Sequence, residues 1–201
     1  MLISPNTVLH FWFEDCRPHQ WFRRNAHFDA VVIDRFGKLT SSALNGELTH
    51  WEQNATGALA LVLILDQFTR QIWRDQPRAF AGDPHSLRLT DQAIANGWLA
   101  EEPERVRRQF WLMPMLHSEQ LGVIQEAVSV MERWSDPATV AVARRNKDLI
   151  QRFGRYPQRN AALGRPSTQE ELEFLKDWQS RGKTKKSQSH ACEQCSSQGT
   201  I

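Results

Sequence analysis

Three polar side chains directly follow the most apolar run of the chain and are the first candidates for chemistry. Residues 59–65 are all apolar, and Asp66, Gln67 and Arg70 come next. An acid four residues before an arginine is the favoured order for an ion pair within one helix. A charge at the end of a buried helix needs a partner. Two interpretations therefore stay open: a buried pair that holds helices in register, or a ligand-binding or catalytic site.

His117 is the second candidate, because Ser118 and Glu119 follow it directly and place a carboxylate close by. A histidine beside a carboxylate can act as a general acid or base. We therefore consider His117 as a catalytic base, with Glu119 or Asp66 as its partner. The structural alternative is a histidine that only forms hydrogen bonds at the start of a helix after Pro114, where a proline is expected to disrupt helix geometry.

Arginine is the dominant cation, with 19 arginines against 6 lysines. The guanidinium group meets a carboxylate or phosphate with two parallel hydrogen bonds, so arginines are typical of anion sites. A coding bias toward arginine explains this count equally well. The positions of the arginines must therefore decide between coding bias and selection for anion contacts. The segment 153–166 is a polar connection of a length that is often functional. The candidates beyond Arg70 are Arg78 and, in this segment, Arg155, Arg159, Asn160 and Arg165.

Metal and cofactor signatures are missing from the sequence. The histidines have no metal-type spacing, and neither a metalloprotease motif, nor a nucleophile elbow, nor a phosphate loop occurs. His190, Cys192 and Cys195 lie together near the C-terminus, but a structural zinc site needs four ligands on an ordered frame. We expect no metal and no cofactor.

The charge distribution argues against nucleic acid as a partner. The net charge is +2, but residues 180–201 alone carry a surplus of +3, so the rest of the chain is nearly neutral. The longest apolar run, 58–65, is far short of the roughly 18 residues that span a bilayer. With three cysteines and no secretory pattern at the start, we expect a cytoplasmic protein that does not enter the membrane.

Helical periodicity and capping residues predict an all-α fold of seven or eight helices. We expect one helical domain over residues 1–179 and a disordered, basic, polar tail over residues 180–201. The predicted helices begin at Ser4-Pro5 and Asp83-Pro84, or span about 26–44, 56–73, 119–134, 136–153 and 168–179.

Several short segments together resemble a known family. They are residues 8–13, 65–70, 77–80, 117–119, 153–157 and 163–168, which read VLHFWF, LDQFTR, PRAF, HSE, FGRYP and LGRPST. Over residues 5–178 the chain is similar to the bacterial and fungal family catalogued as domain of unknown function 924. The resemblance implies antiparallel helix pairs stacked in a superhelix like that of tetratricopeptide-repeat domains. It implies no activity.

The chain departs from the family pattern at positions that bear on function. Family members usually carry histidine where this chain has Asn146 and Gln158, and often an acid where it has His10 and Asn25. Those changes disfavour a proton-transfer or metal site around His117 but leave the arginines intact. We therefore favour a binding module over an enzyme.

The favoured hypothesis is an arginine-rich polar pocket for a small anionic ligand or an acidic peptide. Its residues would be Asp66, Gln67, Arg70, Arg78, His117, Glu119, Arg155, Arg159, Asn160 and Arg165. One alternative is a hydrolase or isomerase that uses His117 with Glu119 or Asp66. The other is a purely structural domain that binds a protein partner or a second copy of itself.

Overall fold

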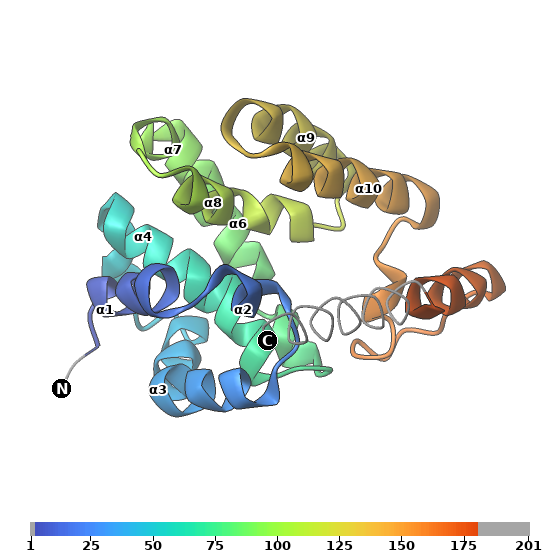
Figure 1. Ribbon diagram of the computed structural model, residues 1–201, viewed down its shortest axis with the longest axis horizontal. Coiled ribbons are helices and arrows are strands. Elements are labelled where there is room, and N and C mark those ends of the chain that lie inside the picture. The colour runs from blue at the N-terminus through green and yellow to red at the C-terminus, as the bar shows by residue number, and fades with distance from the viewer. Residues whose placement is uncertain (1–2, 181–201) are drawn as a thin grey trace, which may run out of the picture. The chain divides into compact units, whose positions relative to one another are not determined.

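The computed structural model describes residues 3–180, and these form helices and connections without a β-strand (Figure 1). The α-helices are α1 (Pro5–His10), α2 (Pro18–Phe22), α3 (Ala26–Leu44), α4 (Ala55–Val62), α5 (Thr69–Ile72), α6 (Asp83–Ala95), α7 (Trp98–Glu101), α8 (Arg105–His117), α9 (Leu121–Trp134) and α10 (Pro137–Phe153). Residues 169–180 are also helical. Two π-helical segments, Phe11–Asp15 and Leu63–Phe68, and three 3-10 segments, Thr49–Gln53, Pro77–Phe80 and Pro157–Arg159, complete the helical structure of the described residues.

The chain divides into two compact units, residues 1–155 and residues 156–201, and each is described by itself. The single domain expected over residues 1–179 stays a prediction. The expected disordered tail, with His190, Cys192 and Cys195, lies outside the described residues apart from Ser180, which ends the last helical segment.

Capping residues set several helix boundaries where the sequence predicts them. The Ser4 side chain accepts a hydrogen bond from the Thr7 amide, and that of Asp136 accepts from two amides at the start of α10. α3 spans the predicted residues 26–44. At the last helix, the Thr168 amide donates to the Glu171 carboxylate and the Glu171 amide donates to the Thr168 hydroxyl, which is a reciprocal capping box.

Two predicted boundaries are wrong. Asp83 does not cap α6, because Gly82 holds the cap position and the Asp83 carboxylate instead forms an ion pair with Arg70. Pro114 does not break its helix but lies inside α8. An internal proline costs about 3 kcal/mol or more. Residues 110–116 are all buried, and their burial outweighs that cost. His117 is consequently the last residue of a helix and not a helix-start residue.

The predicted number of helices, seven or eight, is too low. The described chain has ten helices from α1 to α10 before the last helical segment. α2, α5 and α7 have only four or five residues each. A helix of about one turn is too short to show the apolar periodicity on which the prediction depends.

α4 and the π segment after it form the centre of the first unit. Every residue from Ala58 to Leu65 is at most 2% exposed. α4 packs against α1, α6 and α8 (Figure 1). This confirms the prediction that the run starting near Thr56 is a core helix buried on all sides.

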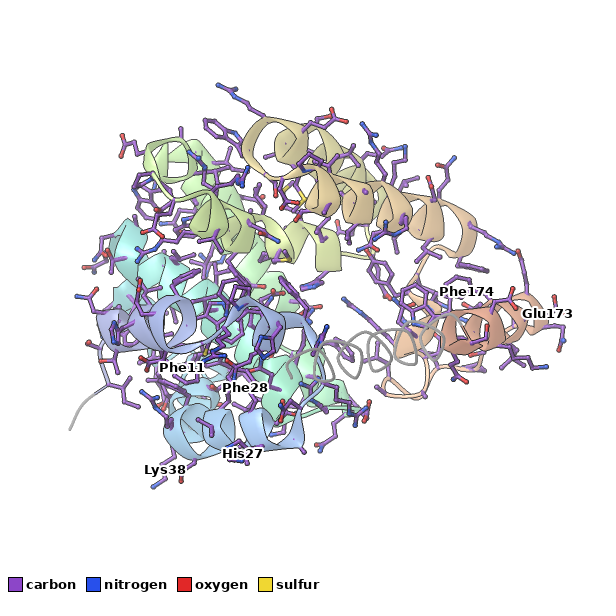
Figure 2. The ribbon with its side chains drawn as sticks, in the orientation of Figure 1. Phe11, His27, Phe28, Lys38, Glu173 and Phe174 are labelled. Carbon is purple, nitrogen blue, oxygen red and sulfur yellow. The ribbon has the colours of Figure 1, made fainter. Side chains whose placement is uncertain are left out.

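Aromatic side chains join α3 to this core. The Phe11 ring packs against the rings of Phe28, Phe36 and Phe68. Figure 2 shows Phe11 and Phe28 directed into the space between their two elements and Lys38 on the outer side of α3. The apolar face of α3 is therefore fixed against the segments that carry the site.

α9 and α10 lie side by side and are joined by two residues, so they form a helical hairpin (Figure 1). α8 packs against both α6 and α9. The tetratricopeptide-like superhelix that the resemblance implies stays a prediction. Between residues 3 and 180 no helix has the length and apolar character that crossing a membrane requires.

Candidate functional site

The polar residues that follow the core helix lie on a π-helical segment. Residues Leu63–Phe68 continue α4 with a wider turn and lead into α5. π-helical turns within α-helices are rare and occur frequently at functional sites. This segment carries Asp66, which is 0% exposed, and Gln67, which is also buried. The fold therefore holds a carboxylate at its centre, where it must find partners within the protein.

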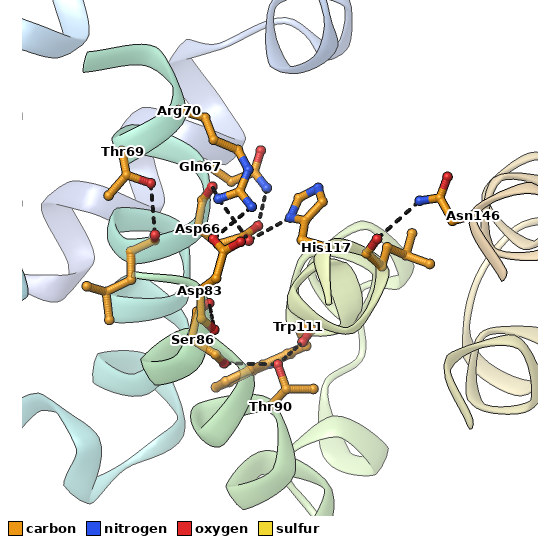
Figure 3. A network of polar contacts seen from close by, with 12 residues as sticks. Asp66, Gln67, Thr69, Arg70, Asp83, Ser86, Thr90, Trp111, His117 and Asn146 are labelled. Carbon is orange, nitrogen blue, oxygen red and sulfur yellow. Dashed lines mark hydrogen bonds and ion pairs between the residues drawn. The ribbon is translucent and has the colours of Figure 1, made fainter. Parts of the chain in front are cut away.

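Asp66 has hydrogen-bond partners on both carboxylate oxygens (Figure 3). Its Oδ1 lies 2.6 Å from Nδ1 of His117, the last residue of α8. Its Oδ2 accepts a hydrogen bond of 2.5 Å from Nε2 of Gln67. The sequence analysis offers Asp66 and Glu119 as carboxylate partners of His117. In the structure, Asp66 contacts Nδ1 of His117.

Arg70 bridges two carboxylates. Its Nη1 lies 3.4 Å from Oδ1 of Asp66 and donates a hydrogen bond of 2.6 Å to the Asp66 carbonyl oxygen, so the pair predicted from the sequence is confirmed. Its Nη2 lies 2.8 Å from Oδ1 of Asp83, in an ion pair whose atoms are not aligned as a hydrogen bond. Asp83 reaches Arg70 because Gly82 allows the start of α6 to pack directly against the carbonyl of Leu65.

Burial and neighbouring charges act in opposite directions on the pKa of Asp66. Burial is the largest effect and raises this pKa, since it penalises the charged form. The charges of His117 and Arg70, with hydrogen bonds from His117 and Gln67, outweigh burial and hold the pKa of Asp66 at about 2. Asp66 is therefore ionised at neutral pH.

The ionised carboxylate fixes the position of a proton on His117. A carboxylate can only accept hydrogen bonds, so Nδ1 of His117 must be the donor in the 2.6 Å contact. In the neutral imidazole, the lone pair is then on Nε2. This is the tautomer that a general base requires.

A cavity of about 410 Å³ lies in the first unit beside these residues. Its volume is within the range of sites for small molecules. α2, the π segment, α5, α8 and α10 all contribute to its wall. The lining residues are Trp21, Phe22, Arg23, Gln67, Arg70, Gln71, Arg74, Gln109, Met113, Leu116, His117, Ala138, Thr139, Val142 and Asn146.

Most polar side chains in this wall already have protein partners. Arg74 forms a bidentate pair with Asp29, with contacts of 2.5 and 2.7 Å. Gln109 donates to the Thr139 hydroxyl, which in turn donates to Asp136, the cap of α10. The Asn146 amide donates to the Leu116 carbonyl (Figure 3).

Two polar lining residues differ from the rest. Within residues 3–180, neither the Arg23 side chain nor the Gln71 side chain forms a hydrogen bond or an ion pair, and Oε1 of Gln71 is a buried acceptor without a donor. Arg23 is exposed at the end of α2, whereas Gln71 is 5% exposed. They are the polar side chains of the wall that have no partner among residues 3–180.

The structure brings together four of the predicted site residues. Asp66 and Gln67 lie on the π segment, Arg70 on α5 and His117 at the end of α8, all in one hydrogen-bonded group. Arg78 and Glu119 are not in the cavity wall.

The Arg78 guanidinium lies 4.1 Å from the centre of the Trp73 ring and donates to the Ser41 hydroxyl. Arg155 is half-buried at the end of the first unit and is also not among the residues that line the cavity.

The remaining predicted residues, Arg159, Asn160 and Arg165, belong to the second unit, where Asn160 and Arg165 contact one another. The Asn160 amide donates to Ser167 and to Glu171, and Nε of Arg165 donates to Oδ1 of Asn160. The Arg159 guanidinium lies 4.9 Å from the centre of the Tyr156 ring. That these residues meet the same ligand as Arg70 stays a prediction.

Sequence reasoning missed several lining residues, above all Arg23, Gln71 and Arg74. Gln71 and Arg74 follow Arg70 closely, and this proximity was the available signal. Arg23 lies after a five-residue helix that the periodicity does not reveal. In the sequence, only the comparison with the family pattern points to Asn146, which lines the same cavity as His117.

The described residues offer no ready-made metal centre. Within residues 3–180, no group of three or more His, Cys, Asp or Glu side chains could hold a metal ion. The chemistry available at the cavity is that of arginine, amide and imidazole side chains, with a buried carboxylate behind them.

Comparison with known proteins identifies the family. The family model described as "Bacterial protein of unknown function (DUF924)" matches residues 8–178. The chain belongs to this family. The family match spans the cavity, the Asp66–His117 pair and the second unit up to its last helix.

A solved structure has a similar fold. It is a protein of unknown function, ATU0120, from Agrobacterium tumefaciens, with 32% sequence identity and a TM-score of 0.80. The match covers 86% of this chain and 97% of the other. A comparison with curated proteins found no match.

Proposed function

We propose that the cavity of the first unit binds a small organic anion with a single negative charge. The observation that carries this proposal is the charge of the wall. Three arginines and a histidine line the cavity, and no Asp or Glu does. Arginine is the side chain best suited to meet a carboxylate or phosphate with paired hydrogen bonds.

The carboxylate partners of the three arginines favour one binding position for a negative group of the ligand. Arg70 faces Asp66 and Asp83, which lie behind the wall, and Arg74 is paired with Asp29. Arg23 has no carboxylate partner within residues 3–180. Arg23 is therefore the one guanidinium of the wall that has no carboxylate among residues 3–180, and a single carboxylate on the ligand would pair with it.

The rest of the wall suits a carbon skeleton. Met113, Leu116 and Val142 contribute apolar side chains, and Phe22 is 60% exposed next to Arg23. Pockets with mostly apolar walls and a few placed polar groups are typical of sites for small organic ligands. A short-chain carboxylate fits both the charge and the apolar surface.

A thermal-shift screen tests the proposal directly. The panel contains inorganic phosphate, short-chain carboxylates, phosphate monoesters, nucleotides and a short acidic peptide. A ligand that binds only the folded protein, at 100 times its Kd, stabilises it by about 2.7 kcal/mol. We expect a carboxylate to raise the Tm of the wild type and to lose most of this effect in Arg23→Ala.

Arg24→Ala is the matched control. Arg24 is the next residue, is exposed, is paired with Asp75 and is not in the cavity wall. It should respond to the anion as the wild type does. If no anion stabilises the wild type more than Arg23→Ala, or if both variants lose the response equally, the proposal is wrong.

Acid–base catalysis by His117 is a second candidate function, favoured by the Asp66–His117 contact. The ionised Asp66 holds Nδ1 of His117 as a donor, which gives the imidazole the tautomer of a general base. The reaction class that the residues suit is hydrolysis or isomerisation of a bound organic anion. Arg70 and Arg23 would balance negative charge that develops on the substrate.

Affinity and turnover separate the two functions. His117→Ala is compared with the wild type for binding of the best carboxylate and for turnover of a panel of related acids that keep this carboxylate and carry an ester or amide bond elsewhere. Loss of a general base lowers the rate by about 10²–10⁴-fold. Retained affinity with lost turnover identifies an enzyme, whereas a wild type that binds but converts no panel member supports a binding module.

A further inference from the structure

The Gln71 side chain lines the cavity but has no polar partner in the described part of the protein. It lies on α5, one residue after Arg70, and is 5% exposed. Its side chain forms no hydrogen bond within residues 3–180, and its Oε1 is buried without a donor. A buried amide without partners is rare in folded proteins, because leaving it unpaired is costly.

Two other glutamines in the same wall form hydrogen bonds within the protein, as expected of glutamines with a structural role. Gln67 donates to the Asp66 carboxylate, and Gln109 donates to the Thr139 hydroxyl. Both are held by the protein itself. Gln71 lines the same cavity without any such contact, so a ligand that paired with its amide would not have to displace a partner among residues 3–180.

We propose that Gln71 is a specificity residue that recognises a hydroxyl group on the ligand, so that the cavity selects hydroxylated short-chain carboxylic acids. This inference rests on the proposed anion site, in which Arg23 holds the carboxylate. Gln71 then discriminates between an acid that carries a hydroxyl and the same acid without one. A site built to bond a polar group rejects analogues that lack it.

A hydroxyl is the group that best complements this amide. It is both a donor and an acceptor, so it can pair with either end of the side chain. The terminal amide torsion of glutamine has broad, roughly two-fold minima, and a rotation can bring either Oε1 or Nε2 to the cavity. A second carboxylate on the ligand would add a charge for which the wall has no further unmatched arginine among residues 3–180.

Matched acids test the inference on the full chain. Hexanoate is compared with 2-hydroxyhexanoate, 3-hydroxyhexanoate and 6-hydroxyhexanoate by calorimetry, with the wild type and Gln71→Met. Methionine keeps the length of the side chain and removes the amide. We expect one hydroxy acid to bind the wild type about 10-fold tighter than hexanoate, in line with one recovered hydrogen bond, and this preference to vanish in Gln71→Met.

The outcomes separate this inference from the proposed function. If all four acids bind the wild type equally and Arg23→Ala weakens all of them, the anion site stands and the hydroxyl specificity is wrong. A hydroxyl preference that persists in Gln71→Met also overturns the role of Gln71. If none of the acids binds but phosphate does, the ligand class is wrong while the anion site stands, and if no anion binds, both fail.

Stability without ligand gives a second, independent readout. Because the Gln71 amide is unpaired, Gln71→Met should leave the Tm unchanged or raise it by about 2–4 °C. Gln92→Met is the control, since Nε2 of Gln92 donates to the Glu52 carbonyl and its loss should lower the Tm. If Gln71→Met lowers the Tm as much as Gln92→Met does, the Gln71 amide has a structural role and the inference is wrong.

Discussion

Oδ1 of Asp66 and Nδ1 of His117 lie 2.6 Å apart, although the two residues are separated by 51 positions in the sequence. Asp66 comes from the π segment after the core helix, and His117 ends α8. Their contact joins the centre of the first unit to a wall of the cavity. The same carboxylate also faces Arg70, so one fully buried charge organises the polar group on this side of the cavity.

Asp66→Asn should strongly destabilise the protein. The asparagine side chain is neutral, so Arg70 and His117 lose the negative charge that Asp66 places beside them. Breaking a buried ion pair by removing one partner costs about 3–5 kcal/mol. Urea denaturation monitored by tryptophan fluorescence measures the loss. Asp34→Asn, an exposed site without a partner in the described chain, should stay within about 0.5 kcal/mol of the wild type.

Asp66 also gives the stability of the protein a defined acid dependence. Its pKa is lowered from 3.8 to about 2, so the folded state favours the ionised form. The stabilisation is complete above the unfolded pKa and disappears as the pH falls from about 4 towards 2. Urea midpoints measured across this window should fall more steeply for the wild type than for Asp66→Asn. Parallel pH profiles of the two proteins would contradict this assignment.

Gly82→Ala should disturb the contact between α6 and the π segment. An added Cβ would lie 2.2 Å from the carbonyl oxygen of Leu65, so the backbone must move, and with it Asp83. We expect a loss of about 3 kcal/mol, at the upper end of overpacking effects. Gly37→Ala in α3 is the matched control, because its Cβ meets nothing within 4 Å. That variant should gain about 0.5–1 kcal/mol by chemical denaturation.

Asp136→Ala should loosen the wall that α10 contributes. Asp136 caps two amides of this helix and accepts a hydrogen bond from the Thr139 hydroxyl. Loss of such a cap costs about 0.5–2 kcal/mol. Amide hydrogen exchange should show faster opening in the first turn of α10. Asp148→Ala, an exposed change further along the same helix, should leave exchange there unchanged.

Local signals were sufficient for much of the fold. Serine and aspartate caps predicted the starts of α1 and α10, helical periodicity predicted α3, and an unbroken apolar run predicted the buried core helix. The short helices were missed because about one turn has no measurable periodicity. Pro114 was misread because a residue's local preference does not include the burial of its neighbours.

The sequence by itself determined the all-helical class, the core helix and the pair of Asp66 with Arg70, because each depends on residues within one or two helical turns of one another. Only the tertiary structure decided that His117 and Asp83 complete this group, that Arg23 and Gln71 reach the same cavity, and that Arg78 does not. Contacts between distant residues follow from how buried helices pack, here through the close approach of Gly82 to Leu65. That packing depends on many side chains at once and cannot be inferred from any single sequence motif.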